Sequence, residues 1–564
     1  MTSTGRTPAP RPNVCQSLPW LPVVLTLCSC GGGRLSPPPQ EQTGSACWGT
    51  STQKPSPYEL IVKPQPGVDL DTFDRGLFSE AGVTGCIGRS AVTGACLVRL
   101  KGDGDPDAVA RNLMTLGGNR LEYVVPNAPV YFEPTPPDEP TAGECSGPKD
   151  ESVCQPQPAP AVPPADRCYK KQTQLIGLEA EQAWAAPAPL IPGGVPDAQT
   201  LNPIVTALID TGIQLSHEDL RCNIFPGKDF TCGSNSCSTP PEDNSEKHGT
   251  RMAGIIAASA NTFGVRGVAW NTQVMPLKIA VGSSSTDWQA GLAIEYAAAK
   301  KVSVVNASWM SVCPLPYVFD TLRGASAQGV LFVSAAGNDG KDLELAGRAR
   351  YPAMYNLPNT VTVMSYSEGW QPTVSSNWGP HTVDLAAPGG AYTTLKCAAA
   401  NCYGRAGPDS TSAATAYVSG AAALIKSAHR DWRPEWIKSL LMDSAIPEKA
   451  LQGKSRTGGR LGLAGAMVGP LHVLAPAAGA HWKNGPNEVR WSNDYLSNLC
   501  TAVYIEISRD GVNYSSLLKA TANIGEAMVR PAYVNAPQQA RIRISCLPAG
   551  FQAVSKEFEL EPRS

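Results

Sequence analysis

The sequence has few histidines, no long basic run and no apolar run that could span a membrane beyond its first forty residues. Its 564 residues include six His, and the 46 Lys and Arg nearly balance the 48 Asp and Glu, for a formal net charge of −2. This balance argues against a nucleic-acid-binding surface. No cysteines have the CxxC…CxxC spacing of a zinc site, so a transition-metal enzyme is not expected either.

The first forty residues contain no Asp or Glu. Arg6 and Arg11 precede the apolar stretch LPWLPVVLTL, which has the length of a signal-peptide core and is too short to cross a bilayer as a helix. The following LCSCGGG resembles a bacterial lipoprotein signal, with Leu three residues before Cys30 and a small Ser before it. We expect residues 1–30 to direct export, with Cys30 lipidated and the protein membrane-anchored; a plain secretory signal is the alternative.

Cysteine usage fits an oxidising, exported compartment. Of the seventeen cysteines, Cys15, Cys28 and Cys30 belong to the leader, which leaves an even number of fourteen. The sequence does not fix how they pair. Plausible pairs are Cys232 with Cys237, Cys397 with Cys402, Cys86 with Cys96, Cys145 with Cys154, and Cys500 with Cys546.

The length predicts two or more domains. Residues 58–132 combine strand-like segments with DPDAVARNLMTLG, which has helical spacing after an Asp cap, and indicate a small α+β domain. Residues 133–166 are so rich in proline that we expect a tether or cleavable linker that does not pack. Residues 470–564 alternate with period two and predict an antiparallel β-sandwich.

Residues 167–467 alternate short apolar runs rich in β-branched residues with helix-like segments. The runs are PIVTALID, QVMPLKIA, VSVVNASW, GVLFVSAAG and TVTVMSY, and the intervening segments include HGTRMAGIIAASA and STDWQAGLAIEYAAAKK. This alternation predicts an α/β fold, a mostly parallel sheet with helices on both faces. Active groups in such folds lie where strands end and loops or helices begin.

Three motifs fall at such ends. Asp210 ends a strand in ALIDTG, His248 begins a helix in KHGTRMAGIIA, and Ser412 precedes the helix AATAYVSGAAALI. Each alone has a plainer interpretation, such as a helix cap or a surface histidine. Together they have a chemical logic, because a serine hydroxyl needs an imidazole to take its proton, and the imidazole needs a carboxylate to orient it. The order Asp, His, Ser on a parallel scaffold is the order found in subtilisin.

With the patterns D-T-G, H-G-T-x-x-A-G and T-S followed by small residues, this region resembles the subtilisin-like serine proteases. GVRGVAW, VVNASWM, VSAAGNDG and VDLAAPGG match further family segments. The resemblance covers about 300 residues and implies catalytic roles for Asp210, His248 and Ser412, with Asn338 and the Ser412 N–H stabilising the oxyanion. It also implies substrate binding by two segments, formed by Ser308, Trp309, Met310, Ala335, Ala336 and Gly337.

The resemblance extends to two accessory features. Residues 58–132, with their ending EYVVPNAPVY, resemble the family's inhibitory propeptide; an unrelated N-terminal domain is the alternative. A structural Ca²⁺ site is implied by Asp219, Asn261, Phe263 and Val265, because carboxylate, amide and carbonyl oxygens suit this ion. The alternative is a solvated loop with capping residues. No organic cofactor is expected.

Four positions depart from the family pattern. Ser410 and Met310 stand where glycine is usual, Ala413 where methionine is usual, and Ala416 where proline is usual. Ser410 has less backbone freedom than glycine, which bears on the geometry before the nucleophile. The large side chain of Met310 should narrow or reshape a substrate subsite, so broad specificity is not expected.

The sequence therefore predicts an exported serine endopeptidase that acts on proteins or peptides and is activated by removal of its propeptide. If the cut falls near residues 131–166, maturation would also release the enzyme from its lipid anchor. The alternative is an inactive scaffold that binds a partner or polysaccharide through its C-terminal sandwich. Another class of serine hydrolase is disfavoured, because the G-x-S-x-G pattern is missing around Ser412.

Overall fold

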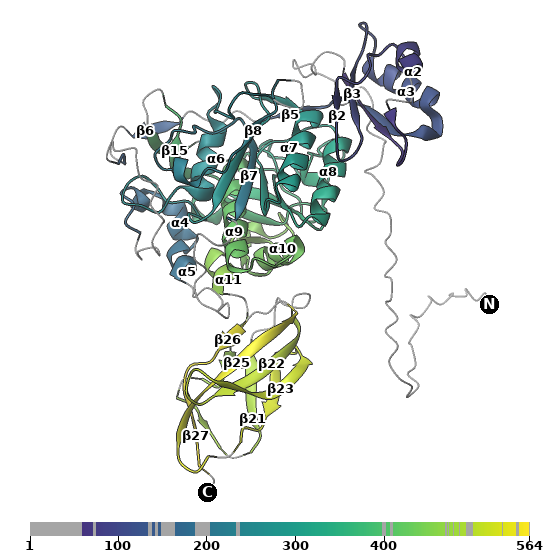
Figure 1. Cartoon of the computed structure of the whole chain (residues 1–564). Helices are drawn as coiled ribbons and strands as arrows, with labels where there is room; N and C mark the ends of the chain where they lie inside the picture. Colours follow the sequence, from purple (N-terminus) through teal and green to yellow (C-terminus); the bar gives the residue numbers. More distant parts are fainter. Residues whose placement is uncertain are drawn as a thin grey trace, which may run out of the picture. The chain divides into compact units, whose positions relative to one another are not determined.

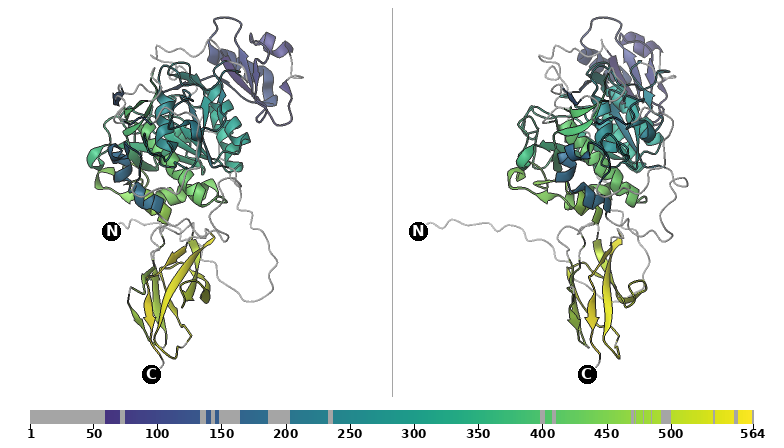
Figure 2. Two further views of the ribbon diagram at one scale, coloured as in Figure 1. Left: turned by 60° about the vertical axis from the view of Figure 1, so that its left-hand side comes forward. Right: turned by 90° about the vertical axis from the view of Figure 1, so that its left-hand side faces the viewer.

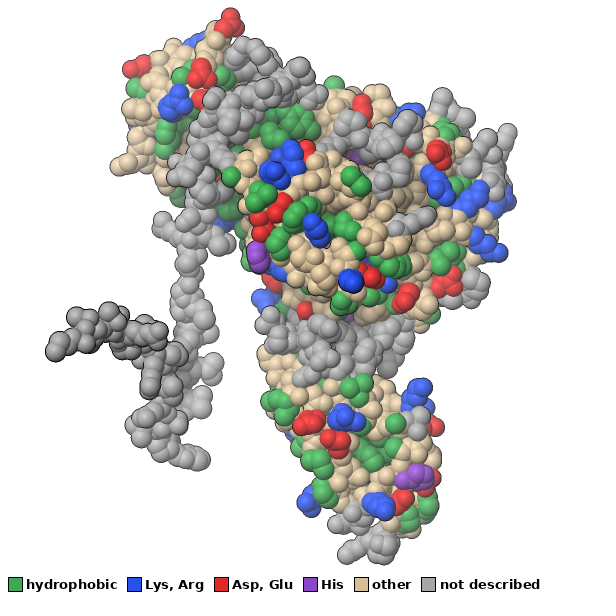
Figure 3. All heavy atoms as spheres, turned by 180° about the vertical axis from the view of Figure 1, so that it is seen from behind, with side chains coloured by type: hydrophobic (Ala, Val, Ile, Leu, Met, Phe, Trp, Pro, Cys, Tyr) green, Lys and Arg blue, Asp and Glu red, His purple; other side chains and the backbone are tan. Residues whose placement is uncertain are grey.

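The computed structural model describes residues 59–70, 75–132, 138–141, 145–147, 164–185, 203–232, 237–397, 402–406, 410–468, 471, 473–477, 479–483, 485–491, 500–532, 534–548 and 552–562. The predicted lipidation site, Cys30, lies outside these residues, so that prediction is untested. Within them, no helix is both long and apolar enough to cross a membrane. On the face shown in Figure 3, acidic and basic side chains are interspersed.

The N-terminal module, residues 59–132, is a four-stranded antiparallel sheet with helices. The strand order is β2 (Gly88–Arg89), β3 (Cys96–Arg99), β1 (Glu59–Pro64), β4 (Leu121–Pro126). Helices α2 (Arg75–Glu80) and α3 (Pro106–Gly117) accompany it, and Asp105 caps α3 by accepting from the Asp107 N–H, as the sequence predicted. Cys86 and Cys96 form a disulfide inside the module.

The central domain is built on a nine-stranded sheet that is parallel except where its edge strand β17 pairs with β18, and it confirms the predicted fold class (Figure 1). The strands in spatial order are β17 (Ile446–Pro447), β18 (Gly459–Arg460), β14 (Leu385–Pro388), β13 (Thr360–Tyr366), β12 (Leu331–Ala335), β11 (Val304–Ala307), β7 (Val205–Asp210), β9 (Gln273–Lys278) and β8 (Lys228–Asp229).

The two faces of this sheet belong to two different hydrophobic cores. Leu208 of β7 lies in one core, while its neighbours Ala207 and Ile209 lie in the other. Helices α6 (His248–Ala257) and α9 (Thr411–Ala428) contribute to the first core, and α7 (Asp287–Ala299) and α8 (Pro316–Ala327) to the second. Because both faces are covered, the strands are apolar along their whole length rather than alternating.

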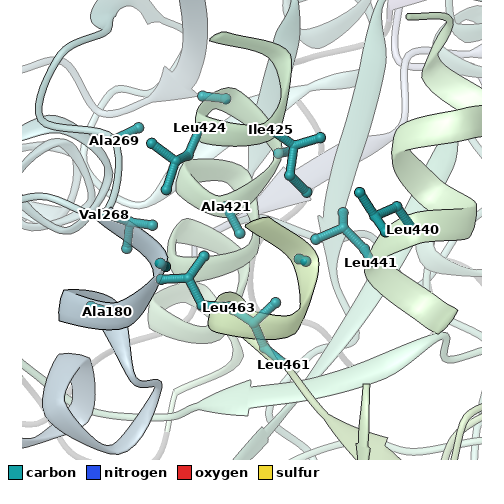
Figure 4. Packing of buried hydrophobic residues seen from close by; sticks show 14 of the residues in the cluster. Ala180, Val268, Ala269, Ala421, Leu424, Ile425, Leu440, Leu441, Leu461 and Leu463 are labelled. Atoms are coloured by element: carbon teal, nitrogen blue, oxygen red, sulfur yellow. The ribbon is translucent and has the colours of Figure 1, made fainter. Parts of the chain in front are cut away.

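Helix α9 is deeply enclosed, and all its residues from Thr411 to Ile425 are buried. Its Ala421, Leu424 and Ile425 are surrounded by apolar side chains from several elements (Figure 4). These neighbours come from α5 (Ala180–Ala185), α10 (Pro434–Asp443), α11 (Leu463–Val468) and the loop that carries Val268. The helix that begins next to Ser412 is therefore rigidly held.

Part of the predicted linker packs, which corrects the expectation for residues 133–166. Residues Glu139–Thr141 form strand β6, which pairs with β16 (Cys402–Ala406), itself paired with β15 (Ala391–Leu395). Cys145 is disulfide-bonded to Cys168, so the suggested pair with Cys154 is wrong. Proline fits an edge strand such as β6 because an edge strand does not need every N–H for pairing.

The described part of the C-terminal region consists of β-strands and their connections, as predicted (yellow in Figure 2). One sheet holds β19 (Val473–Ala475), β21 (Asn487–Trp491) and β24 (Glu526–Val529); the other holds β20 (His481–Trp482), β27 (Phe558–Leu560), β25 (Gln538–Pro548), β22 (Cys500–Ser508) and β23 (Tyr514–Ala522), with β26 (Gln552–Val554) beside β25. Cys500 and Cys546 are bonded. Trp482 and Trp491 are buried, so they are core residues.

Candidate active site

Asp210 and His248 meet at the carboxyl end of strand β7. Asp210 is the last residue of β7 and His248 the first residue of α6. The Nδ1 of His248 lies 2.8 Å from one carboxylate oxygen of Asp210 and 3.0 Å from the other, and both side chains are buried. Because the carboxylate only accepts, Nδ1 carries the proton and Nε2 is left as the basic nitrogen. The buried Nε2 hydrogen-bonds to no residue that the structure describes.

A second buried carboxylate, which sequence reasoning missed, fixes this pair. The Thr211 N–H donates to Asp210 at 2.7 Å, and the Thr211 hydroxyl donates to Asp243 at 2.6 Å and accepts from the Gly249 N–H at 2.9 Å. Asp243 also accepts from the Thr250 N–H at 2.9 Å. Burial raises the pKa of Asp243, against the opposing effect of these hydrogen bonds. The network joins the end of β7 to the start of α6.

Ser412 lies at the N-terminus of α9. Ser410 is the N-cap of this helix, and its hydroxyl oxygen accepts from the Ser412 N–H at 3.1 Å. The Ser412 hydroxyl lies 3.5 Å from the Ser308 carbonyl, which follows β11. Among the described residues no hydrogen bond joins the Ser412 hydroxyl to His248. Such bonds are often long before substrate binds and tighten only in the reacting complex.

Asn338 is oriented against the same helix terminus. Its Oδ1 accepts from both the N–H and the hydroxyl of Thr411, at 2.8 Å and 2.9 Å. With its oxygen engaged, the amide NH₂ group remains as a donor beside Ser412. Gly337, at φ +97°, donates from its N–H to the Thr411 hydroxyl at 3.2 Å. The segment after β11, with Ser308, and the segment after β12, with Gly337 and Asn338, therefore both contact the start of α9.

An extended part of the chain itself lies beside these residues, between β10 and Met310, and we call the space that it occupies the cleft. Strand β5 (Pro129–Tyr131) pairs antiparallel with β10 (Ser284–Thr286). On its other side, the Tyr131 N–H donates to the Met310 carbonyl at 2.8 Å and the Met310 N–H to the Tyr131 carbonyl at 3.0 Å. The next residue, Phe132, lies with its ring centroid 5.6 Å from that of His248. Residues 129–132 thus complete a three-stranded arrangement, as an extended peptide substrate would.

Of the predicted substrate-binding residues, some contact the strand in the cleft and others are buried in the domain. Met310 pairs with the strand through its backbone, and its sulfur lies against Gly337, since a Cβ added there would fall 2.7 Å from Sδ. The side chain of Trp309 instead packs in the sheet core, with its ring 6.3 Å from that of Phe332. The other predicted residues, Ser308, Ala335 and Ala336, are all buried at the ends of β11 and β12.

The N-terminal module also contacts the outer surfaces of α7 and α8. Asp320 of α8 accepts from the Lys63 ammonium at 2.6 Å and from the Tyr123 hydroxyl at 3.0 Å. Glu295 of α7 accepts from the Ser90 hydroxyl at 2.6 Å. Burial raises the pKa of Glu295, although the hydrogen bond from Ser90 opposes this. These contacts hold the module in place when β5 occupies the cleft.

The four predicted calcium ligands lie in one loop region. Asp219 is completely buried and accepts from the Asn261 amide at 2.7 Å and from the Val265 N–H at 2.8 Å, while the Asn261 oxygen accepts from the Phe263 N–H. Burial, with the nearby charges of Asp166 and Glu218, raises the pKa of Asp219 well above its usual range. No ion pair with Asp219 is found among the described residues. The groups that contact the Asp219 carboxylate here are N–H donors, so a hard cation would need the oxygen atoms of these residues to turn towards it.

The chain is similar in sequence to known serine proteases. The family model described as the subtilase family matches residues 202–467. The chain is 34% identical over 227 residues to the major intracellular serine protease of Bacillus subtilis. The aligned region covers 40% of this chain and 68% of that protein. It is 32% identical over 245 residues to subtilisin of Bacillus pumilus, spanning 43% and 83%. Among solved structures, a protease from Pseudoalteromonas arctica aligns with a TM-score of 0.45 and 24% identity, covering 54% of this chain and 98% of that chain.

Proposed function

The chain belongs to the subtilase family of serine-type endopeptidases, and from this premise we propose that Ser412 is its nucleophile, His248 its general base and Asp210 the residue that orients His248. The observation that carries the assignment is the Asp210–His248 pair, which leaves His248 Nε2 as a basic nitrogen in a buried site. Without such a base, a serine hydroxyl is a poor nucleophile near neutral pH.

In the proposed reaction, His248 takes the proton of the Ser412 hydroxyl as the oxygen attacks the peptide carbonyl. It then gives that proton to the leaving amine, which breaks the C–N bond and leaves an ester on Ser412. Water attacks the ester by the same route and restores the serine. Asp210 stabilises the imidazolium that forms between the two proton transfers.

We further propose that the Asn338 amide and the Ser412 N–H stabilise the oxyanion of the tetrahedral intermediate. The orientation of Asn338, with its oxygen held by Thr411, supports the first donor. The second donor is engaged in the described structure by the Ser410 hydroxyl, which must turn away as the oxyanion forms. The positive end of the α9 dipole favours negative charge at the same point.

The N-terminal module, residues 58–132, is proposed to act as an inhibitory propeptide. Its β5 strand and Phe132 occupy the cleft in the manner of a substrate, with Phe132 against His248. Protein and peptide substrates would need the same backbone partners on β10 and Met310, so the module and a substrate compete directly. Activity is then expected only after the module has been cut from the catalytic domain and has dissociated.

Export, lipidation at Cys30 and release on maturation remain part of the proposal. Cys86 and Cys96 pair with each other, so neither ties the module to the catalytic domain. Cys47, the third cysteine that could do so, lies outside the described residues. Since β6 and the Cys145–Cys168 bond hold the chain from Glu139 onward, a cut between Phe132 and Glu139 would free the module. Non-reducing gels of the processed protein test this, because a module that stays attached until reduction contradicts release.

A structural Ca²⁺ is proposed at Asp219, with Asn261, Phe263 and Val265 around it. A bound cation would supply charge compensation for the buried carboxylate, so its role would be to stabilise the loop rather than to take part in hydrolysis.

The experiment that tests the central assignment compares wild type with Ser412→Ala and His248→Ala after export. We expect wild type alone to hydrolyse an unfolded protein substrate and to shorten its own chain. If the variants hydrolyse the substrate as fast as wild type, the assignment of Ser412 and His248 is wrong. If wild type neither hydrolyses protein nor shortens, while folding normally, the inactive-scaffold alternative holds and the C-terminal sandwich becomes the place to seek function.

A further inference from the structure

The strand in the cleft defines which position of a bound peptide meets Ser412. Tyr131 pairs antiparallel with Met310, so the position two residues further along a bound peptide falls opposite Ser308. The Ser308 carbonyl is the atom that lies 3.5 Å from the Ser412 hydroxyl. The peptide residue opposite Ser308 is therefore the one whose carbonyl Ser412 would attack. We refer to it as the attacked residue.

The side chain of the attacked residue must point away from His248. Phe132 occupies the preceding position and faces His248, and side chains along an extended strand alternate between its two sides. The other side is bordered by Met310 and by the segment Gly337–Asp339, because Met310 Sδ lies against Gly337 and Asn338 is bonded to Thr411. The residues along this border decide which attacked residue is accepted.

This border carries more positive than negative charge. Asp339 follows Asn338, and one of its oxygens accepts from Arg350 Nε at 2.7 Å and from the Asn377 amide at 3.2 Å. Its other oxygen lies 3.6 Å from the Lys341 ammonium. Asn377 also donates to the Ala336 carbonyl, and its Nδ2 lies 2.6 Å from a Cβ built on Gly337, which places the whole group beside the cleft wall.

Arg350 is the buried cation of this group, with a side chain 5% exposed. Its Nη1 donates to the Ala349 and Arg348 carbonyls, and its Nη2 hydrogen-bonds to none of the residues within the described ranges. Burial alone would raise the pKa of Asp339, but the hydrogen bonds from Arg350 and Asn377 and the charges of Arg350 and Lys341 lower it below its ordinary value. Asp339 is thus ionised and already satisfied by two cations, which leaves one positive charge in excess.

We propose that the cleft selects an acidic residue, Glu or Asp, as the attacked residue, with Arg350 as the residue that determines this specificity. The inference rests on the proposed function and names its substrate class. A carboxylate on the attacked residue would accept a hydrogen bond from the Nη2 of Arg350, which has no other partner among the described residues. A Lys or Arg side chain at the same position would be repelled by the uncompensated positive charge. Met310 narrows the remaining space and disfavours a large aromatic side chain. The sequence of the chain agrees, since the residue after Phe132 is Glu133.

The test uses the exported, processed enzyme and a series of acyl-Val-Tyr-Phe-X peptides with a fluorogenic amide after X, where X is Glu, Asp, Gln, Ala, Phe or Lys. Glu and Gln are the decisive pair because they have the same shape and differ in charge. We expect kcat/KM for Glu to exceed that for Gln by about 10- to 100-fold, the usual worth of a hydrogen bond to a charged group. Arg350→Gln should bring this ratio close to one, and Arg350→Lys should restore part of it.

Arg348→Gln is the matched control, because this exposed arginine lies two residues away and should leave the Glu/Gln ratio unchanged. Labelling by a fluorophosphonate reports a working Ser412 in each variant and is independent of X. An enzyme that labels but cleaves the Gln, Ala or Phe peptide as well as the Glu peptide contradicts the inference. Loss of labelling in wild type contradicts the proposed function instead. If Arg350→Gln fails to fold, the wild-type ratio and Arg350→Lys still decide.

Discussion

The hydroxyl oxygen of Ser410 accepts a hydrogen bond from the backbone N–H of Ser412 at 3.1 Å. This bond caps α9, but it also engages one of the two donors proposed to stabilise the oxyanion. The same residue therefore stabilises the helix and competes with the developing negative charge. Glycine, which lacks the hydroxyl, would leave the donor free.

Ser410→Gly is expected to raise kcat severalfold, because the Ser412 N–H no longer exchanges partners as the oxyanion forms. The melting temperature should change little, since replacing a serine N-cap by glycine costs only about a few tenths of a kcal/mol. Steady-state kinetics on one peptide substrate, with Ser410→Ala as the comparison, check this. A kcat that falls in both variants would show that the hydroxyl assists the reaction.

Asn338→Ala should lower kcat by about 10²–10³-fold with a much smaller effect on KM, because its amide interacts with the oxyanion and not with the ground-state carbonyl. Asn338→Asp should be at least as damaging, since it places negative charge where negative charge develops. A variant that loses affinity but keeps its kcat would move Asn338 from oxyanion stabilisation to substrate binding.

Asp287, at the start of α7, should make the stability of the folded protein depend on pH. Burial raises its pKa to about 7, with a further contribution from the charge of Asp320 and opposition from the Val318 and Tyr317 N–H groups. The folded protein disfavours the charged form of the Asp287 carboxyl group. The stability that the neutral carboxyl group allows is therefore fully present below about pH 4 and is lost as the pH rises towards 7. Asp287→Asn should therefore stabilise the protein more at pH 8 than at pH 5. Melting curves at both values check it, and an equal shift at both would contradict the assignment.

Removal of calcium should lower the melting temperature of wild type, because Asp219 would then be a buried carboxylate without a counterion. In Asp219→Asn the difference between samples with EDTA and with added Ca²⁺ should disappear. Asp342→Asn, outside this loop, is the control and should keep the difference. Identical melting of wild type under both conditions would argue that the hydrogen bonds from Asn261 and Val265 suffice.

The bond that follows Glu133 joins it to Pro134. The nitrogen of this bond carries a ring carbon in place of hydrogen, which crowds the point where His248 must deliver a proton. Self-cleavage at this bond should therefore be slow, and Pro134→Ala should accelerate it. Mass spectrometry of the purified chain would show a new terminus after Glu133, absent when Ser412→Ala is added. No new terminus in Pro134→Ala would contradict the register deduced from Tyr131 and Met310.

The parts of the structure that sequence predicted are those encoded locally. Strands such as β7 and β13 are continuous apolar runs, and the motifs around Asp210 and His248 fall at element ends whose positions the parallel sheet dictates. The structure brings these two side chains together without any departure from the expected order. The resemblance to a family then placed Asn338 and Ser412 beside the same helix terminus.

The rest depends on contacts between distant segments, which no local pattern reveals. Asp243 and Arg350 look like ordinary charged loop residues until folding buries them against Thr211 and Asp339. Cys145 pairs with Cys168, not with the cysteine nearer in sequence, because Gly264 binds both segments, donating to the Cys145 carbonyl and accepting from the Cys168 N–H. What distinguishes Asp243 and Arg350 from other charged loop residues is their burial, and burial is not visible in one sequence.

The most direct test of the account is to identify the residue that a fluorophosphonate modifies. The protein after export would be treated with the probe, digested, and the adduct located by mass spectrometry. We predict one adduct, on Ser412 at the start of α9, and its loss in His248→Ala because the hydroxyl is then no longer activated. An adduct on any other residue, or equal labelling of Ser412 without His248, would contradict the proposed mechanism.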